Sequence, residues 1–144
     1  MPCYNSIDGE PASVSHRLLT ELLRERMGFD GLCISDYGGI SNAHEVQQIG
    51  ETIGETGFLA MEAGMDIEMP KATGYGEELK EMFRSGQADT ELLDRTVLRV
   101  LEAKFRMGLF EQPFAMDGES CKKIFEEKEG RSCPFGRQGN PWCF

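Results

Sequence analysis

The residues best suited to chemistry stand close together, where the short apolar run of residues 32–34 leads to the acid Asp36. Tyr37 and two glycines follow the acid directly. A short apolar run bounded by turn-forming residues is typical of a buried parallel strand. Because α/β barrels hold their catalytic groups at the carboxyl ends of such strands, Asp36 is predicted to be a catalytic carboxylate. In the alternative interpretation, Asp36 caps a turn or the following helix.

Strand-like and helical patterns alternate along the chain and would hold Asp36 in place. Ser13 and Asp89 are predicted to cap two of the helices at their N-terminal ends. The order predicts an α/β fold with a parallel sheet and three visible strand–helix units. In chain order the predicted elements are a strand end at 1–4, a loop at 6–12, a helix at 14–27, a strand at 31–35, a loop at 36–48, a helix at 51–63, a strand at 65–69, and helices at 77–84 and 90–107.

Helical spacing of apolar residues predicts which faces of the first and last helices are buried. In the first helix the stripe includes Leu19 and Leu22 and extends to Met27. In the last helix the predicted buried stripe comprises Leu92, Leu93, Val97, Val100, Leu101 and Phe105.

Composition excludes several classes of function. The chain has 144 residues, which suits one domain, and its formal net charge is -10. An acidic chain is a poor partner for nucleic acid or for an anionic membrane surface, since both attract basic patches. No apolar run reaches membrane-spanning length, and the first residues do not show the basic region followed by an apolar stretch that is expected of a secretory signal. The expected compartment is the cytoplasm.

Five cysteines are present, and their spacing gives no support to a metal or redox motif, because no Cys-x-x-Cys pair occurs. Cys3 and Cys33 lie in apolar contexts and are predicted to be buried thiols. Cys121, Cys133 and Cys143 lie in a C-terminal stretch without apolar periodicity. We expect no metal and no cofactor.

Four segments in order carry a family resemblance: residues 3–13, 28–40, 63–70 and 100–110. Together they resemble glycoside hydrolase family 3, the β-glucosidase and β-xylosidase group, over roughly residues 1–114. The resemblance implies that residues 1–112 are the last three βα units of a (β/α)₈ barrel. Such a barrel needs about 250 residues, so three units alone would leave both edge strands unpaired. Residues 113–144 are then a linker or an aberrant tail, with a frameshift or a natural extension as the two alternatives.

The resemblance also implies an activity: retaining hydrolysis of β-linked glucosides or xylosides, without a cofactor. Asp36 matches the family nucleophile, and Tyr37 fills the aromatic position after it. Tyr4 matches a tyrosine that borders the nucleophile, and Met69 would line the pocket wall. With Tyr37 they are the predicted substrate-binding residues, and the alternative for Tyr4 and Met69 is ordinary packing. Retaining enzymes need a second carboxylate about 5–5.5 Å away. The resemblance places that acid/base outside this chain.

Other titratable residues are expected to be structural. The resemblance assigns Asp66 and Glu68 to salt bridges or loop hydrogen bonds rather than to a catalytic pair. His16 is predicted to lie on the surface. His44 follows Asp36 in a predicted loop and either approaches the sugar or is solvated.

Two functional alternatives remain. The segment Tyr37-Gly38-Gly39 could bind phosphate at the end of a late barrel strand, although no lysine or arginine lies within it. The chain could also be a non-catalytic remnant with no activity of its own. For the 144 residues alone we expect no useful turnover, because the nucleophile lacks its partner and most of its pocket.

Overall fold

The computed structural model describes residues 1–113, 118–119 and 122–123. Residues Met1–Met107 form one compact unit, which holds every element discussed below. The predicted tail, residues 113–144, lies almost entirely outside the described residues, as do Cys121, Cys133 and Cys143.

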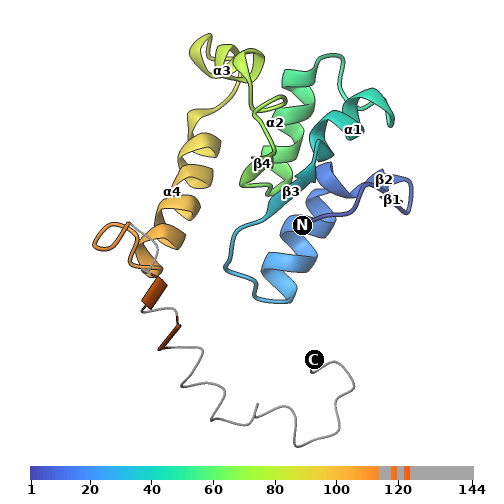
Figure 1. The fold of residues 1–144 in the computed structure, drawn as a ribbon. Helices are drawn as coiled ribbons and strands as arrows, with labels where there is room; N and C mark the ends of the chain where they lie inside the picture. The colour runs from blue at the N-terminus through green and yellow to red at the C-terminus, as the bar shows by residue number, and fades with distance from the viewer. Residues whose placement is uncertain (114–117, 120–121, 124–144) are drawn as a thin grey trace, which may run out of the picture. The chain divides into compact units, whose positions relative to one another are not determined.

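The α/β class is confirmed, because short strands alternate with helices along the chain (Figure 1). β3 and β4 pair in parallel at the centre, and α1 and α2 form the crossover between them. The elements are β1 (Ser6–Ile7), β2 (Glu10–Pro11), the 3₁₀-helix η1 (Ala12–Val14), the π-helix η2 (Arg17–Arg26), β3 (Ile34–Tyr37), α1 (Gly39–Glu45), α2 (Ile53–Ala63), β4 (Ile67–Met69), α3 (Glu77–Arg84) and α4 (Thr90–Arg106).

The N-terminal segment differs from its prediction. Residues 1–4 form no strand, since β3 and β4 are the only partners in their sheet among the described residues. The predicted loop contains the small hairpin β1–β2, whose turn residues Asp8 and Gly9 both have positive φ, at 54° and 84°. Such values at both central positions suit a tight hairpin turn.

Ser13 was predicted to cap the first long helix, and that prediction is wrong. Ser13 lies buried within η1. Ser15 takes the capping role instead, since its hydroxyl accepts the N–H of Leu18 at 3.3 Å. The 3₁₀-helix η1, with three residues, therefore moves the start of the long helix towards the C-terminus.

The first long helix, η2, is wound with i→i+5 hydrogen bonds, as in the bond from the Met27 N–H to the Leu22 carbonyl (3.0 Å). One of its side chains contacts the C-terminal end of α2: the Thr20 hydroxyl donates to the Ala63 carbonyl oxygen at 2.8 Å. Met27, a predicted stripe residue, is 71% exposed, so that part of the prediction is wrong. The buried stripe is reduced to Leu19.

Helix α1 was predicted to be loop, and that prediction is wrong. Its sequence offers few apolar residues, but Ile40 and Ala43 are both fully buried. Tertiary packing of these two side chains thus decides the helix. Helix α2 begins with Thr52, which accepts the Glu55 N–H at 3.2 Å, and ends at Gly64.

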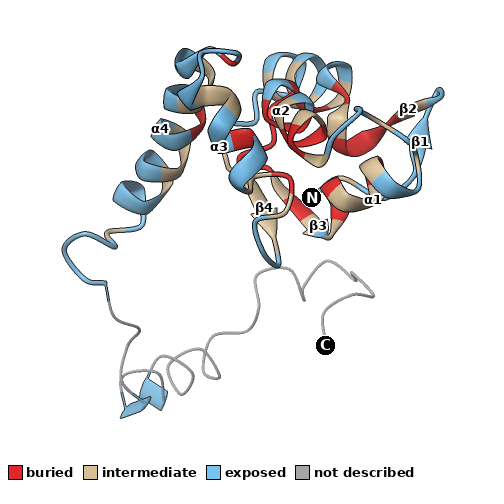
Figure 2. Ribbon diagram, turned by 90° about the horizontal axis from the view of Figure 1, so that it is seen from above, coloured by how far each residue is buried: buried red, intermediate tan, exposed pale blue. Residues whose placement is uncertain are grey.

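The core lies among η2, β3, α1 and α2, where the buried residues gather in Figure 2. Cys33 is buried as predicted, but Cys3 is exposed, because the segment that holds it joins no sheet. On α4 the predicted buried stripe is wrong in part: Val97, Leu101 and Phe105 are exposed, Leu92, Leu93 and Val100 are half-buried, and Thr96 is the buried residue. Asp89 does cap α4, accepting the Glu91 N–H at 2.9 Å.

Candidate active site

Asp36 lies in β3 at a point where that strand carries one residue more than its partner. Ile34 pairs with Ile67, and Tyr37 pairs with Met69, so three steps along β3 match two steps along β4. The register therefore slips around Asp36, an arrangement known as a β-bulge. Bulges bend a strand and redirect side chains, and they are frequent beside active sites.

Hydrogen bonds fix the backbone around Asp36, whose side chain is half-buried. The buried Ser35 hydroxyl donates to the Asp36 carbonyl oxygen (2.9 Å) and accepts the Met69 N–H (2.8 Å). The Asp36 carboxylate accepts the Tyr37 N–H at 2.8 Å. The Gly38 N–H donates to the Met69 carbonyl oxygen at 2.8 Å. Little backbone freedom remains where the predicted nucleophile is attached.

Tyr4 approaches the same segment from the N-terminal end of the chain. Its hydroxyl donates to the Tyr37 carbonyl oxygen at 2.7 Å. Desolvation raises the pKa of the Tyr4 hydroxyl above its ordinary value, and the neighbouring Asp36 carboxylate raises that pKa further. Since Tyr4 is 41% exposed, the alternative of a core aromatic does not describe it. The structure brings Tyr4 and Asp36 together, and the role of the pair stays a prediction.

Tyr37 and Met69 lie opposite each other at the carboxyl ends of β3 and β4. The Tyr37 side chain is 66% exposed and Met69 is half-buried. All four predicted site residues are therefore gathered at one end of the two-stranded sheet. Their contacts with a sugar remain predictions.

The phosphate-loop alternative is disfavoured by the same hydrogen bonds. A phosphate site would need the N–H groups of residues 37–39 to point at the ligand. The Tyr37 N–H already donates to Asp36, and the Gly38 N–H donates to Met69. Two of the three backbone donors are thus used within the protein.

Asp66 has a structural role, as predicted. Its carboxylate is fully buried and lies 2.6 Å from Arg24 Nη2 and 3.1 Å from Arg99 Nη1. It also accepts the backbone N–H of Cys33 at 2.8 Å. One side chain thereby joins η2, α4 and the segment that leads into β3.

Glu68 likewise forms the predicted loop hydrogen bonds. Its carboxylate accepts three consecutive backbone N–H groups, those of Thr73 (2.8 Å), Gly74 (3.0 Å) and Tyr75 (2.9 Å). These bonds fold the loop that follows β4 back onto its own strand. Glu68 is therefore committed to shaping the loop next to Met69.

Neither histidine lies among the predicted site residues. His16 is exposed, as predicted, and its Nδ1 lies 3.5 Å from Glu21. His44 ends up in α1, with Nδ1 at 3.1 Å from the Ile49 carbonyl oxygen and 3.2 Å from the Thr56 hydroxyl. His44 therefore braces the connection between α1 and α2.

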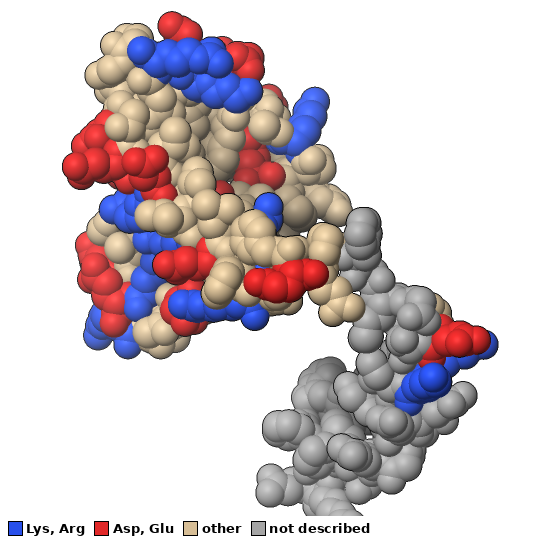
Figure 3. Space-filling model, turned by 90° about the vertical axis from the view of Figure 1, so that its left-hand side faces the viewer, with Lys and Arg blue, Asp and Glu red and all other residues tan. Residues whose placement is uncertain are grey.

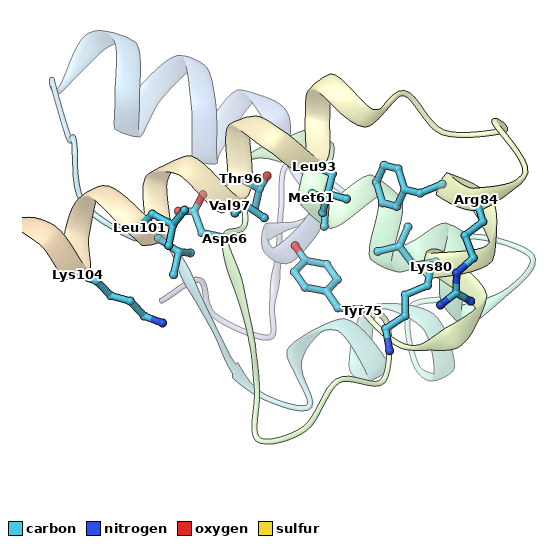
Figure 4. A pocket seen from close by; sticks show the side chains of 13 residues that line it. Met61, Asp66, Tyr75, Lys80, Arg84, Leu93, Thr96, Val97, Leu101 and Lys104 are labelled. Atoms are coloured by element: carbon cyan, nitrogen blue, oxygen red, sulfur yellow. The ribbon is translucent and has the colours of Figure 1, made fainter. Parts of the chain in front are cut away.

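A cavity of about 580 Å³ lies away from these residues, between α2, α3 and α4 (Figure 4). Apolar side chains such as Leu79 and Val97 line it, and Lys80 and Lys104 stand at its edges. Tyr75 also lines the cavity, and its hydroxyl donates to the Met65 carbonyl oxygen at 2.7 Å. None of the four predicted site residues lines this cavity, so it is not the pocket around Asp36.

Comparison with known proteins decides the family. Residues 1–103 match the glycosyl hydrolase family 3 N-terminal domain. The chain belongs to glycoside hydrolase family 3. Asp36, Tyr4, Tyr37 and Met69 all fall within the matched residues.

Relatives and solved structures of family 3 agree with this assignment. A putative β-xylosidase of Formosa agariphila is 34% identical over 123 residues, which is 85% of this chain and 16% of that protein. A β-glucosidase from Listeria innocua is 35% identical with a TM-score of 0.77, covering 89% of this chain and 18% of its own. A mutant of the Listeria innocua enzyme has been solved with laminaribiose; it is 38% identical, with a TM-score of 0.70, and covers 76% and 15% of the two chains.

The 144 residues thus span less than a fifth of the family 3 relatives named here. In this family 3 chain, acidic and basic side chains are interspersed over the face seen in Figure 3. Within the described ranges, no three His, Cys, Asp or Glu side chains group as a metal site. No helix in that part of the chain has the length and apolar character to cross a membrane.

Sequence reasoning about this family 3 segment missed one residue beside Asp36. Ser35 is fully buried and has two hydrogen bonds at the bulge, yet no role was assigned to it. The available signal was a single hydroxyl inside an otherwise apolar strand, directly before the acid. A buried hydroxyl requires a partner, which points to a specific local structure.

Proposed function

We propose that these residues are part of a retaining β-glycosidase in which Asp36 is the nucleophile. The observation that carries the proposal is the position of Asp36, at the bulged carboxyl end of β3 within the residues that match family 3. A strand end holds a carboxylate with little freedom, and pre-organisation of this kind lowers the cost of reaching the transition state.

The proposed reaction is a double displacement. An oxygen of the Asp36 carboxylate bonds to the anomeric carbon while the bond from that carbon to the aglycone oxygen breaks. A second carboxyl group, outside this chain, protonates the departing oxygen and later takes a proton from water. That water then releases the sugar from Asp36. No cofactor is needed.

The proposed substrates are β-linked glucosides or xylosides. This class is supported by the names of the relatives, which are β-xylosidases and β-glucosidases, and by the laminaribiose bound to the Listeria innocua mutant. Tyr37 offers an exposed aromatic ring beside Asp36, and Met69 offers a flexible apolar wall. We propose both as substrate-binding residues, with Tyr4 supporting the Asp36 segment.

We further propose that β3 and β4 are late strands of a (β/α)₈ barrel. Parallel sheets are ordinarily covered on both faces and continued at their edges, whereas this sheet has two strands in the described residues. The exposed apolar face of α4, with Val97, Leu98 and Leu101, suits a helix that packs on a neighbouring unit. Other units would supply the remaining walls of the sugar pocket.

The test is release of nitrophenol from aryl β-glucosides and aryl β-xylosides by the active enzyme that contains this segment. Asp36→Asn should lower kcat by about 10⁴-fold or more, as loss of a covalent nucleophile does. The control is Asp30→Asn, which alters an exposed carboxylate paired with Arg106. Unchanged release by the Asp36 variant would overturn the assignment.

A non-catalytic role for the 144 residues alone is the second candidate, and it is favoured by the small share of the relatives that they span. Residues 1–144 by themselves should then give no nitrophenol release above buffer. Measurable turnover by this chain, lost on Asp36→Asn, would contradict that expectation while supporting the nucleophile.

A further inference from the structure

We infer that Ser35 is a positioning residue for Asp36, acting through the bulge in β3; the inference rests on the proposed nucleophilic role of Asp36. Ser35 is fully buried, and its side chain is directed at the backbone rather than at solvent. It therefore cannot act on substrate itself. We infer that it affects the reaction by fixing the direction of the Asp36 carboxylate.

The geometry of the bulge explains why a hydroxyl is needed there. Three residue steps along β3 cover the length of two steps along β4, so backbone groups beside the extra residue lose their regular spacing. The Ser35 hydroxyl bridges this place, accepting the Met69 N–H at 2.8 Å and donating to the Asp36 carbonyl oxygen at 2.9 Å. It connects the two strands at the residue that carries the reacting carboxylate.

The bond to the Asp36 carbonyl has a direct consequence for the carboxylate. Fixing that carbonyl fixes the peptide plane between Asp36 and Tyr37, and with it the backbone ψ angle of Asp36. The Tyr4 hydroxyl fixes the next carbonyl, that of Tyr37, at 2.7 Å. A carboxylate attached to this segment keeps one direction of attack instead of sampling several.

The chain supplies a matched control in Ser15. Like Ser35, it is fully buried, donates one hydrogen bond (to Glu10, 2.5 Å) and accepts one backbone N–H (from Leu18, 3.3 Å). It lies just before η2, and its two hydrogen-bond partners, Glu10 and Leu18, are outside the bulge. Both Ser→Ala variants remove a buried hydroxyl with two partners, so a general loss of stability should affect them alike.

The first measurement is hydrogen exchange at single amides in the chain itself. Ser35→Ala should speed exchange of the Met69 amide and leave Leu18 unchanged, and Ser15→Ala should do the reverse. Equal protection of the Met69 amide in the wild type and in Ser35→Ala would overturn the bridge.

The second measurement is the rate at which a 2-deoxy-2-fluoro-β-glycoside with a good leaving group labels Asp36 in the active enzyme. Ser35→Ala should lower the first-order labelling constant by about 10- to 100-fold, as misplacement of a reacting group does, with the saturation constant changed less than about threefold. Ser35→Cys, which keeps the volume but has a weak hydrogen-bonding group, should be slowed to the same degree. Ser15→Ala should stay within about twofold of wild type.

The outcomes separate the two proposals. Failure of the wild type to be labelled at Asp36 would overturn the proposed function. Labelling at Asp36 with an unchanged rate in Ser35→Ala would overturn only the inference about Ser35. A wild-type labelling rate in Ser35→Cys would show that Ser35 acts only by packing. A loss in Ser15→Ala equal to that in Ser35→Ala would show a general effect on stability. Either result rejects the positioning role. If Ser35→Ala does not fold, the volume-matched Ser35→Cys decides alone.

Discussion

The Arg24 guanidinium lies 2.6 Å from the Asp66 carboxylate, with Asp66 fully withdrawn from water and Arg24 only 10% exposed. The two residues are 42 positions apart in the sequence. Arg99 reaches the other carboxylate oxygen from α4 at 3.1 Å. One acid therefore holds together three parts of the chain: η2, α4 and the segment that leads into β3.

Asp66→Asn should destabilise the protein by about 3–5 kcal/mol, because it leaves two arginine side chains near a neutral amide in a buried site. The measurement is the free energy of unfolding from urea titration. Asp30→Asn, which breaks an exposed pair with Arg106, should cost no more than about 1 kcal/mol. Similar losses in both variants would show that the buried position of Asp66 has no special weight.

The stability of the protein should decrease at alkaline pH through Tyr75. Burial raises the pKa of the Tyr75 hydroxyl well above its ordinary value, and the charges of Asp66 and Glu68 raise it further. Between the unfolded pKa, about 10, and the higher folded pKa, the unfolded chain has released a proton that the folded chain keeps. The free energy of unfolding therefore falls as pH rises through this window. Below the window, the ionisation of Tyr75 gives the free energy of unfolding no pH dependence.

Thermal melts from about pH 9 to about pH 11 check this dependence. Tyr75→Phe should flatten the fall in Tm, although it also loses the hydrogen bond to Met65 and starts from a lower Tm. Tyr37→Phe, at an exposed ring, is the control and should keep the wild-type slope. An equally steep slope in Tyr75→Phe would assign the alkaline loss to other groups, such as Cys33, whose pKa burial also raises.

Tyr4→Phe should reduce activity of the enzyme that holds this segment by about tenfold, the factor that corresponds to about 1.4 kcal/mol. The change removes the hydroxyl that donates to the Tyr37 carbonyl but keeps the ring. Steady-state kinetics on an aryl β-glycoside give kcat and KM separately, and the loss should fall on kcat. A loss confined to KM would instead make Tyr4 a substrate-binding residue.

Local chemistry made part of the fold predictable from sequence. Asp89 caps α4 because a short carboxylate before a helix meets unpaired N–H groups, and Gly64 ends α2 because its φ of 114° suits glycine. Both signals lie within a few residues of their effect. Asp36 was selected by the same kind of local signal, as an acid at the end of an apolar run, and its catalytic role stays a prediction.

Features that depend on distant parts of the chain were missed. Helix α1 packs against η1, β3 and α2 and buries Ile40 completely, and its polar sequence does not indicate those partners. The bulge is a relation between β3 and β4, so neither strand contains it alone. On α4 the spacing of apolar residues predicts which face of the helix is apolar but not which element packs against that face. Val97 and Leu101 therefore lie on the apolar face and are still exposed.

The unequal strand lengths have a consequence for how this segment can vary. Between Ile34 and Tyr37 the chain holds two residues, whereas between Ile67 and Met69 it holds one. Deleting either residue of the longer stretch would restore a regular ladder, and adding one to the shorter stretch would do the same. Each of these changes would produce a more regular sheet but would remove or misdirect Asp36, so sequences that keep the proposed reaction should keep the length of both stretches.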